Sequence, residues 1–269
     1  MGKPCCANLL RSTAVENSLI VEGAAKRFGG VTALSGASLD AKSKQIHAII
    51  GPNGAGKTTL INIISGVYPP DEGSVRLNGE VLNGLRSSQI ARKGIARTFQ
   101  NVALFAGMSV VQNILLGRNM LMKSGVWSCA FFWGNARREE VEHRRRVEEI
   151  IDMLNLTDIR RELAGSLPLG LQKRVELGRA LASDPKLLLL DEPMGGMNVE
   201  EKEDMCRYIL DVIELTDTAV LLIEHDMGVV MDISDYIVVL DQGKKIGEGT
   251  PKEILKNQDV IDAYLGASH

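Results

Sequence analysis

The chain is short of aromatic residues and has no long uninterrupted apolar run. Aromatic residues make up 4% of its 269 residues, whereas hydrophobic residues make up 45% and charged residues 24%. This composition is close to that of soluble globular proteins and unlike that of disordered or membrane-embedded chains. No apolar run approaches the roughly 20 residues that a bilayer-spanning helix needs, so we expect that the chain does not cross a membrane itself.

The chain also lacks an excess of positive charge. Its formal net charge is -3, whereas a protein that binds a nucleic-acid backbone is usually clearly basic, so nucleic acid is not expected as a partner. Its four cysteines, Cys5, Cys6, Cys129 and Cys206, do not have the spacing of a metal site, and the N-terminus lacks the apolar core and cleavage site of a signal peptide. These absences favour a cytoplasmic protein with reduced thiols.

The strongest motif is a phosphate-binding loop. Residues 51–58, Gly-Pro-Asn-Gly-Ala-Gly-Lys-Thr, fit the pattern G-x-x-x-x-G-K-S/T, between the apolar run 45–50 and the helix-like run 58–65. In this strand–loop–helix context backbone N–H groups surround phosphates, Lys57 reaches the β and γ oxygens, and the Thr58 hydroxyl binds Mg²⁺. The motif therefore predicts ATP and Mg²⁺ as cofactors. The predicted binding residues of the loop are Asn53, Gly54, Ala55, Gly56, Lys57, Thr58 and Thr59.

Two apolar runs, residues 187–190 and 219–223, do not alternate with polar residues, which indicates strands of a parallel sheet that are buried on both faces. The first is followed by Asp191 and Glu192, and the second leads to His225. We expect Asp191 to hold Mg²⁺, Glu192 to act as the general base on the attacking water, and His225 to contact the γ-phosphate or that water. Glu192 alone could be a capping or surface residue and His225 alone a loop histidine, but their combination with Lys57 favours a catalytic site.

The remaining patterns define the domain organisation. The runs 18–22 and 73–78, with the turn dipeptide Asn78-Gly79, predict a small antiparallel layer, and Val147, Ile150, Ile151 and Leu154 have the spacing of one helical face. The expected fold is an α/β P-loop NTPase core with a parallel sheet, an N-terminal antiparallel β layer and an inserted helical subdomain. The expected boundaries are an extension at 1–17, the core at 18–85 and 172–249, the helical insertion at 86–171, and a helical tail at 250–269.

In their order along the chain, these motifs resemble those of the ABC transporter ATPase family, from Ile20 to Leu265. The resemblance implies that Phe28 stacks on the adenine base, for which a buried core position is the alternative. It also implies that Gln100, within the run Arg-Thr-Phe-Gln-Asn at 97–101, senses Mg²⁺ and the attacking water and links the core to the helical insertion.

Two departures from the family pattern concern contacts between subunits. Residues 167–172, Leu-Pro-Leu-Gly-Leu-Gln, stand where the family signature Leu-Ser-Gly-Gly-Gln belongs. Pro168 replaces the serine that would contact the γ-phosphate of the ATP bound by the opposite subunit, which leaves Gly170 and the helix N-terminus as the expected donors in trans. Asn198 stands where the family usually has an aspartate that makes a contact across the dimer.

Three segments, residues 97–101, 167–174 and 249–266, resemble the branched-chain amino acid importer branch of the family, although related amide and urea importers look much the same. The long insertion around residues 123–146, with the apolar residues Trp127, Phe131, Phe132 and Trp133, also fits this branch. The resemblance implies transmembrane permease subunits, a second ATPase subunit (identical or, as the branch favours, related) and, indirectly, an extracytoplasmic solute-binding protein. The expected location is the inner face of the cell membrane, as a peripheral subunit.

Two other functions are compatible with an ABC-type site. A soluble ABC ATPase that acts in DNA repair or translation usually has two cassettes in one chain or a long coiled-coil insertion. An ABC-like metabolic kinase would need a pocket for an acceptor substrate with its own polar groups. The sequence indicates neither feature, and copurifying molecules would distinguish the three functions.

Overall fold

The computed structural model describes residues 19–100, 102–121 and 135–266. Its strands are β1 (Leu19–Phe28), β2 (Val31–Ala41), β3 (Ile46–Ile50), β4 (Glu72–Leu77), β5 (Glu80–Val81), β6 (Ile95–Arg97), β7 (Leu187–Asp191), β8 (Ala219–Ile223), β9 (Tyr236–Asp241) and β10 (Lys244–Gly249). Its helices are α1 (Lys57–Ile64), α2 (Ser87–Arg92), α3 (Val110–Leu116), α5 (Asn135–Met153), α6 (Leu169–Leu181), α7 (Val199–Leu215), α8 (Met227–Ile233), α9 (Pro251–Ile254) and α10 (Gln258–Gly266), with 3₁₀ turns η1 (Gly117–Met120) and η2 (Ala164–Ser166).

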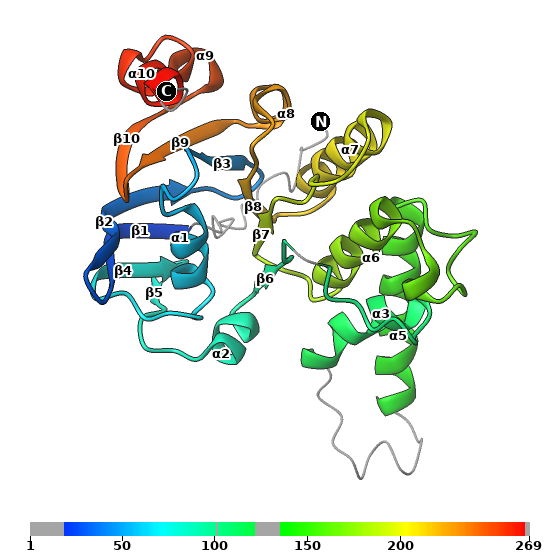
Figure 1. The fold of residues 1–269 in the computed structure, drawn as a ribbon. Coiled ribbons are helices and arrows are strands. Elements are labelled where there is room, and N and C mark those ends of the chain that lie inside the picture. Colours follow the sequence, from blue (N-terminus) through cyan, green and yellow to red (C-terminus); the bar gives the residue numbers. More distant parts are fainter. Residues whose placement is uncertain (1–18, 101, 122–134, 267–269) are drawn as a thin grey trace, which may run out of the picture.

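A six-stranded sheet in the order β10-β9-β3-β8-β7-β6 forms the centre of the molecule (Figure 1). Its strands are parallel except for β10, which pairs with β9 in the antiparallel sense. Successive residues of β7 point to opposite sides: Leu187 and Leu189 join one apolar cluster, and Leu188 and Leu190 join another. Both faces of the strand are therefore covered, which explains why its sequence does not alternate and confirms the predicted buried strands.

The predicted antiparallel layer is confirmed as a second sheet in the order β2-β1-β4-β5. The turn between β4 and β5 is the dipeptide Asn78-Gly79, and both of its residues have positive φ, 52° and 80°, as a tight hairpin turn requires. Leu19 and Val21 of this sheet pack into the same apolar cluster as Leu60 and Ile64 of α1. This layer therefore covers the helix that follows the phosphate-binding loop.

The insertion is helical, as its periodicity predicts. Val147, Ile150, Ile151 and Leu154 are all buried in the cluster that α3, α5 and α6 form against the sheet. Its expected start at residue 86 is wrong, however, because β6 pairs in parallel with β7 and so belongs to the central sheet. A strand of three residues is too short to give a recognisable alternation, so the sequence does not distinguish it from the helices that follow.

The C-terminal tail contains α9 and α10, which lie beyond β10 at the edge of the central sheet (Figure 1). Ile254 and Val260 pack with Ile237 and Val239 of β9. Within the ranges that the structure describes, no helix is long and apolar enough to cross a membrane. The extension at 1–17 and the apolar residues between 127 and 133 lie outside the described residues.

Candidate nucleotide-hydrolysis site

The phosphate-binding loop has a backbone that only glycine can adopt at two of its positions. A Cβ on Gly51 would lie 2.0 Å from the carbonyl oxygen of Leu240, and one on Gly56 would lie 2.5 Å from that of Ala33. Both residues also have positive φ, 150° and 100°, which disfavours other residue types. The loop is thus packed closely against β9 and β2. Asn53, Gly54 and Thr58 are exposed, whereas the Ala55 side chain is buried, so only the backbone of Ala55 can face a ligand.

Lys57 begins α1, and the residue is only 6% exposed. The ammonium group donates hydrogen bonds to the carbonyl oxygens of Gly51, at 2.7 Å, and Pro52, at 3.0 Å. Burial lowers the pKa of this group, and the negative charges of Glu192 and Asp191 oppose that change. The loop therefore holds the lysine ammonium over its own backbone, near the two carboxylates and at the start of the helix, where an anion is favoured.

The Glu192 carboxylate contacts the two other side chains for which we expect a role in hydrolysis, Gln100 and His225. Its Oε2 accepts a hydrogen bond from the Gln100 amide at 2.9 Å, and its Oε1 lies 2.6 Å from Nε2 of His225. The residue has φ of 51°, a left-handed conformation that is costly for a non-glycine residue and is often found at functional sites. The structure thus brings Gln100, Glu192 and His225 together, from three different segments of the chain.

Lys173 and Glu224 support this arrangement, and sequence reasoning missed both. The Lys173 ammonium donates to the main-chain oxygen of Glu192 at 3.1 Å, and burial lowers its pKa against the opposing charges of nearby glutamates. The buried carboxylate of Glu224 accepts from the backbone N–H of Met194 at 2.9 Å and of His225 at 3.1 Å. Glu224 therefore ties together the loops that follow β7 and β8. A charged residue directly after a buried strand is the signal that could have identified it.

Asp191, the expected Mg²⁺ ligand, lies at the end of β7 with its side chain 4% exposed. Its Oδ2 is 2.9 Å from a guanidinium nitrogen of Arg97, a partner that the sequence did not assign. In the part of the chain that the structure describes, no cluster of three or more His, Cys, Asp and Glu residues could hold a metal. Mg²⁺ usually takes one or two carboxylates and completes its coordination with phosphate oxygens and water. The Thr58 hydroxyl, the Asp191 carboxylate and the Gln100 amide oxygen are oxygen donors of the types that Mg²⁺ prefers.

Phe28 is 43% exposed at the end of β1, so it is not a core residue. Its ring centroid lies 5.1 Å from that of Tyr68, with the two planes at 73°, and Nζ of Lys26 lies 5.8 Å from the same centroid. The edge-to-face contact with Tyr68 is a favourable arrangement of two aromatic rings. Phe28 is thus held at the surface, in a position where a base could stack on it.

The signature segment and the start of α7 are in contact within the chain. Pro168 precedes α6, and Gly170 is buried in its first turn. A Cβ on Gly170 would lie 2.3 Å from Oε1 of Glu201. Asn198 and Glu201 bind each other's backbone N–H groups at the start of α7, at 2.9 Å and 3.0 Å. The side chain of Asn198 is therefore engaged in capping its own helix, and a carboxylate lies beside the glycine that was expected to face a phosphate.

A glycine-rich loop before a helix, with acidic residues at the end of another buried strand of the same parallel sheet, defines a P-loop nucleoside triphosphatase. Two family models match the chain: ABC transporter over residues 34–195, and branched-chain amino acid ATP-binding cassette transporter over residues 244–269. The chain therefore belongs to the ABC transporter family, as an ATP-binding cassette that binds and hydrolyses ATP.

Relatives and solved structures agree with this assignment. The chain is 43% identical to the high-affinity branched-chain amino acid transport ATP-binding protein BraF of Pseudomonas aeruginosa, over 92% of this chain and 97% of BraF. It is 40% identical to the corresponding protein LivG of Escherichia coli K12, with the same coverage. A solved ATP-binding cassette of an ABC transporter, MJ1267 in its ADP conformation, has a TM-score of 0.79 and 31% identity, covering 93% of this chain and 99% of that one.

Stacking on Phe28 predicts only modest selectivity between ATP and GTP, because a π-face does not read the edge of a base. We expect Phe28→Ala to weaken binding of both nucleotides by about 1–3 kcal/mol, with Phe105→Ala, another exposed aromatic, as the control. Binding of both nucleotides is measured for the two variants, and hydrolysis of ATP and GTP by the wild-type protein is measured side by side. A preference beyond about 10³-fold, or roughly 4 kcal/mol, would contradict stacking as the main contact with the base.

Proposed function

We propose that this chain is the ATP-hydrolysing subunit of an ABC importer for branched-chain amino acids. The observation that carries the hydrolytic role is the convergence of Gln100 and His225 on the carboxylate of Glu192. The transport role is supported by both family models and by relatives whose names specify branched-chain amino acid transport. A soluble ABC ATPase without a transport role is not supported by these relatives.

The arrangement of side chains supports in-line attack of water on the γ-phosphorus of ATP. Lys57 and the loop N–H groups bind the phosphate oxygens, while Thr58, Asp191 and Gln100 hold Mg²⁺, which neutralises charge on the phosphates. Glu192 accepts a proton from the attacking water as the new O–P bond forms and the bond from the γ-phosphorus to the ADP oxygen breaks. His225 holds the Glu192 carboxylate at 2.6 Å and so orients it.

The site is completed by a second ATPase subunit. In this proposal Gly170 and the N-terminus of α6 approach the ATP held by Lys57 of the partner. Leu169 and Val199, at the starts of α6 and α7, are large exposed apolar residues, which supports an interface at this place. Because the Glu201 carboxylate lies beside Gly170, it must turn away when a phosphate approaches the helix.

The permease subunits place the chain at the inner face of the cell membrane, and the solute-binding protein acts on it only through them. We expect the tagged chain to copurify with permease subunits. The Lys57→Ala variant should copurify equally well but abolish ATP-dependent uptake of labelled leucine, because it removes the phosphate contact and not the subunit interface. Uptake of an unrelated sugar is the control. Copurification with nucleic acid or ribosomes instead, or formation of a phosphorylated small molecule, would contradict the transport role.

A further inference from the structure

Arg97 places a fixed positive charge against the carboxylate that is expected to hold the metal. Its side chain is 11% exposed, and its NH2 nitrogen donates to Asp191 Oδ2 at 2.9 Å. A carboxylate oxygen that accepts this hydrogen bond is less available to Mg²⁺ or to a water of its coordination sphere. The guanidinium and the metal ion are also both positive, so they oppose each other at short range. The same carboxylate therefore has two possible cationic partners.

The guanidinium is held in place by contacts on its other side. Its NH1 nitrogen donates to Asn62 Oδ1 at 2.6 Å and to Ser65 Oγ at 3.1 Å, near the C-terminal end of α1. The ring of Phe99 lies under it, with 5.2 Å between the guanidinium carbon and the ring centroid. The Nε nitrogen is buried without a hydrogen-bond partner among the described residues. These contacts fix the fork of the guanidinium, in a way that a lysine ammonium would not reproduce.

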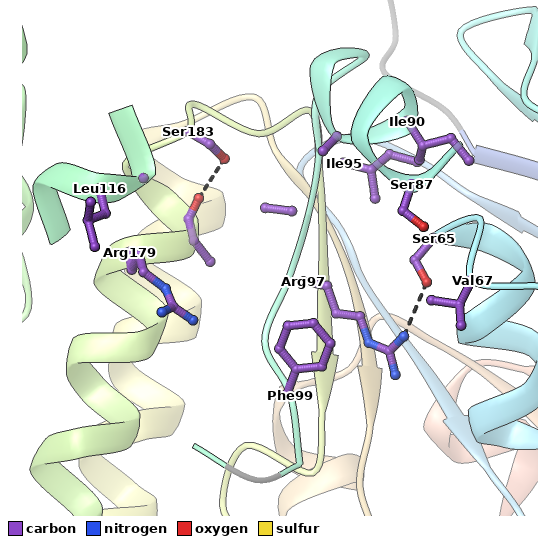
Figure 2. Close-up of a pocket in the computed structure, with 14 residues that line it drawn as sticks. Ser65, Val67, Ser87, Ile90, Ile95, Arg97, Phe99, Leu116, Arg179 and Ser183 are labelled. Atoms are coloured by element: carbon purple, nitrogen blue, oxygen red, sulfur yellow. Dashed lines mark hydrogen bonds between the residues drawn. The ribbon is translucent and has the colours of Figure 1, made fainter. Parts of the chain in front are cut away.

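Arg97 is also accessible from a groove between the core and the helical insertion. This groove has a volume of about 340 Å³, and Figure 2 shows Arg97 and Phe99 on one side of it with Ser65 and Val67, and Leu116 and Arg179 on the other. Arg179 provides a comparison, since it too pairs with a buried carboxylate, that of Glu176, at 3.6 Å. The two arginines differ in that only Arg97 contacts Asp191.

We propose that Arg97 is a positioning residue that competes with Mg²⁺ for Asp191 and thereby sets the Mg²⁺ dependence of nucleotide binding. This inference rests on the proposed ATPase function. The Arg97–Asp191 pair neutralises a buried carboxylate, and removal of one member of such a pair leaves the other charge uncompensated. Without Arg97 the free carboxylate repels ATP in the absence of metal but binds the metal more readily in its presence. The gain in ATP affinity that Mg²⁺ provides therefore becomes larger.

The test measures binding of ATP to the full-length protein, once with Mg²⁺ and once with EDTA. We expect the ratio of the two affinities to rise at least about threefold in Arg97→Met, which keeps an unbranched apolar stem and removes the guanidinium and its charge. Arg97→Lys, which keeps the buried charge paired but loses the guanidinium fork, should give a ratio between those of wild type and Arg97→Met. Arg179→Met is the matched control, because it removes a charge from the same groove and takes the arginine partner from a buried carboxylate, yet its ratio should equal that of wild type.

An unchanged or lower ratio in Arg97→Met would overturn the proposal, and so would an equal rise in Arg179→Met, which would indicate a general effect of lost charge. If Arg97→Met does not fold, as judged by circular dichroism, Arg97→Lys decides: its ratio must exceed that of wild type. Failure of the wild-type protein to bind ATP would contradict the proposed function itself. Tight binding of ATP with an unaltered ratio would contradict only the role of Arg97.

Discussion

Glu192→Gln is expected to bind MgATP nearly as well as wild type and to turn it over at least about 10²-fold more slowly. Glutamine has almost the same shape as glutamate and can still hydrogen-bond to water, to Gln100 or to His225, but it cannot accept the proton of the attacking water. The backbone of residue 192, with its φ of 51°, is expected to be strained to a similar extent in both proteins. The measurements are phosphate release at saturating ATP and equilibrium binding of ATP.

Glu214→Gln is the matched control for this variant. Glu214 lies exposed in the last turn of α7, at the opposite end of the helix from the proposed interface, so the same loss of charge there should leave turnover within about twofold of wild type, as is usual for surface substitutions. Turnover of Glu192→Gln near that of wild type would exclude Glu192 as the general base. Loss of ATP binding in Glu192→Gln would instead assign its carboxylate to binding of the nucleotide or the metal.

Gly170→Asp is expected to abolish hydrolysis while the separate chain keeps its affinity for ATP. The new carboxylate stands at the N-terminus of α6, where it repels the γ-phosphate that the partner subunit presents. The structure adds a second cause, because any Cβ at this position displaces the carboxylate of Glu201. Gly170→Ala separates the two effects: it displaces Glu201 but adds no charge, so it should retain measurable turnover. Binding of ATP, circular dichroism and phosphate release are compared for the three proteins.

A mixing experiment tests whether the site is shared between subunits. Gly170→Asp and Lys57→Ala should each be inactive, whereas a mixed dimer pairs the intact phosphate-binding loop of one with the intact signature of the other and regains activity. In wild type, hydrolysis at saturating ATP should rise faster than linearly with protein concentration while the dimer is dissociated. Strictly linear rates from a demonstrated monomer, or wild-type activity in Gly170→Asp, would contradict a shared site. Self-association without rescue would point to a different ATPase subunit as the natural partner.

The sequence was sufficient to predict the loop and the strands around the candidate site, because both depend on local pattern. The phosphate-binding loop needs glycines and a lysine at fixed spacing, and the strands β7 and β8 are recognisable because both of their faces are apolar. Carboxyl ends of parallel strands meet at one edge of a sheet, so Asp191, Glu192 and His225 could be expected to lie near Lys57. In the structure Glu192 contacts His225, and the charges of Glu192 and Asp191 act on Lys57. The roles of these residues in hydrolysis stay predictions.

The contacts that were missed join segments whose proximity no local pattern shows. Arg97 reaches Asp191 because β6 pairs with β7, although the two are about 90 residues apart in the chain and β6 has only three residues. Likewise, Glu201 lies against Gly170 because the starts of two helices meet in space. Pairing order and helix packing depend on the whole core, so a single sequence without homologues does not specify them.

The side chains of the short segment from β6 to Gln100 point in three directions, so the number of residues in this segment matters for the site. Arg97 turns toward the carboxylate of Asp191, Phe99 toward the groove, and Gln100 toward Glu192. Insertion or deletion of one residue between Arg97 and Gln100 would move at least one of these side chains out of its contact, even if the other side chains were kept. The spacing of these residues is therefore as much a part of the site as their identity, and a cassette engineered by exchange of helical insertions must be joined after residue 100.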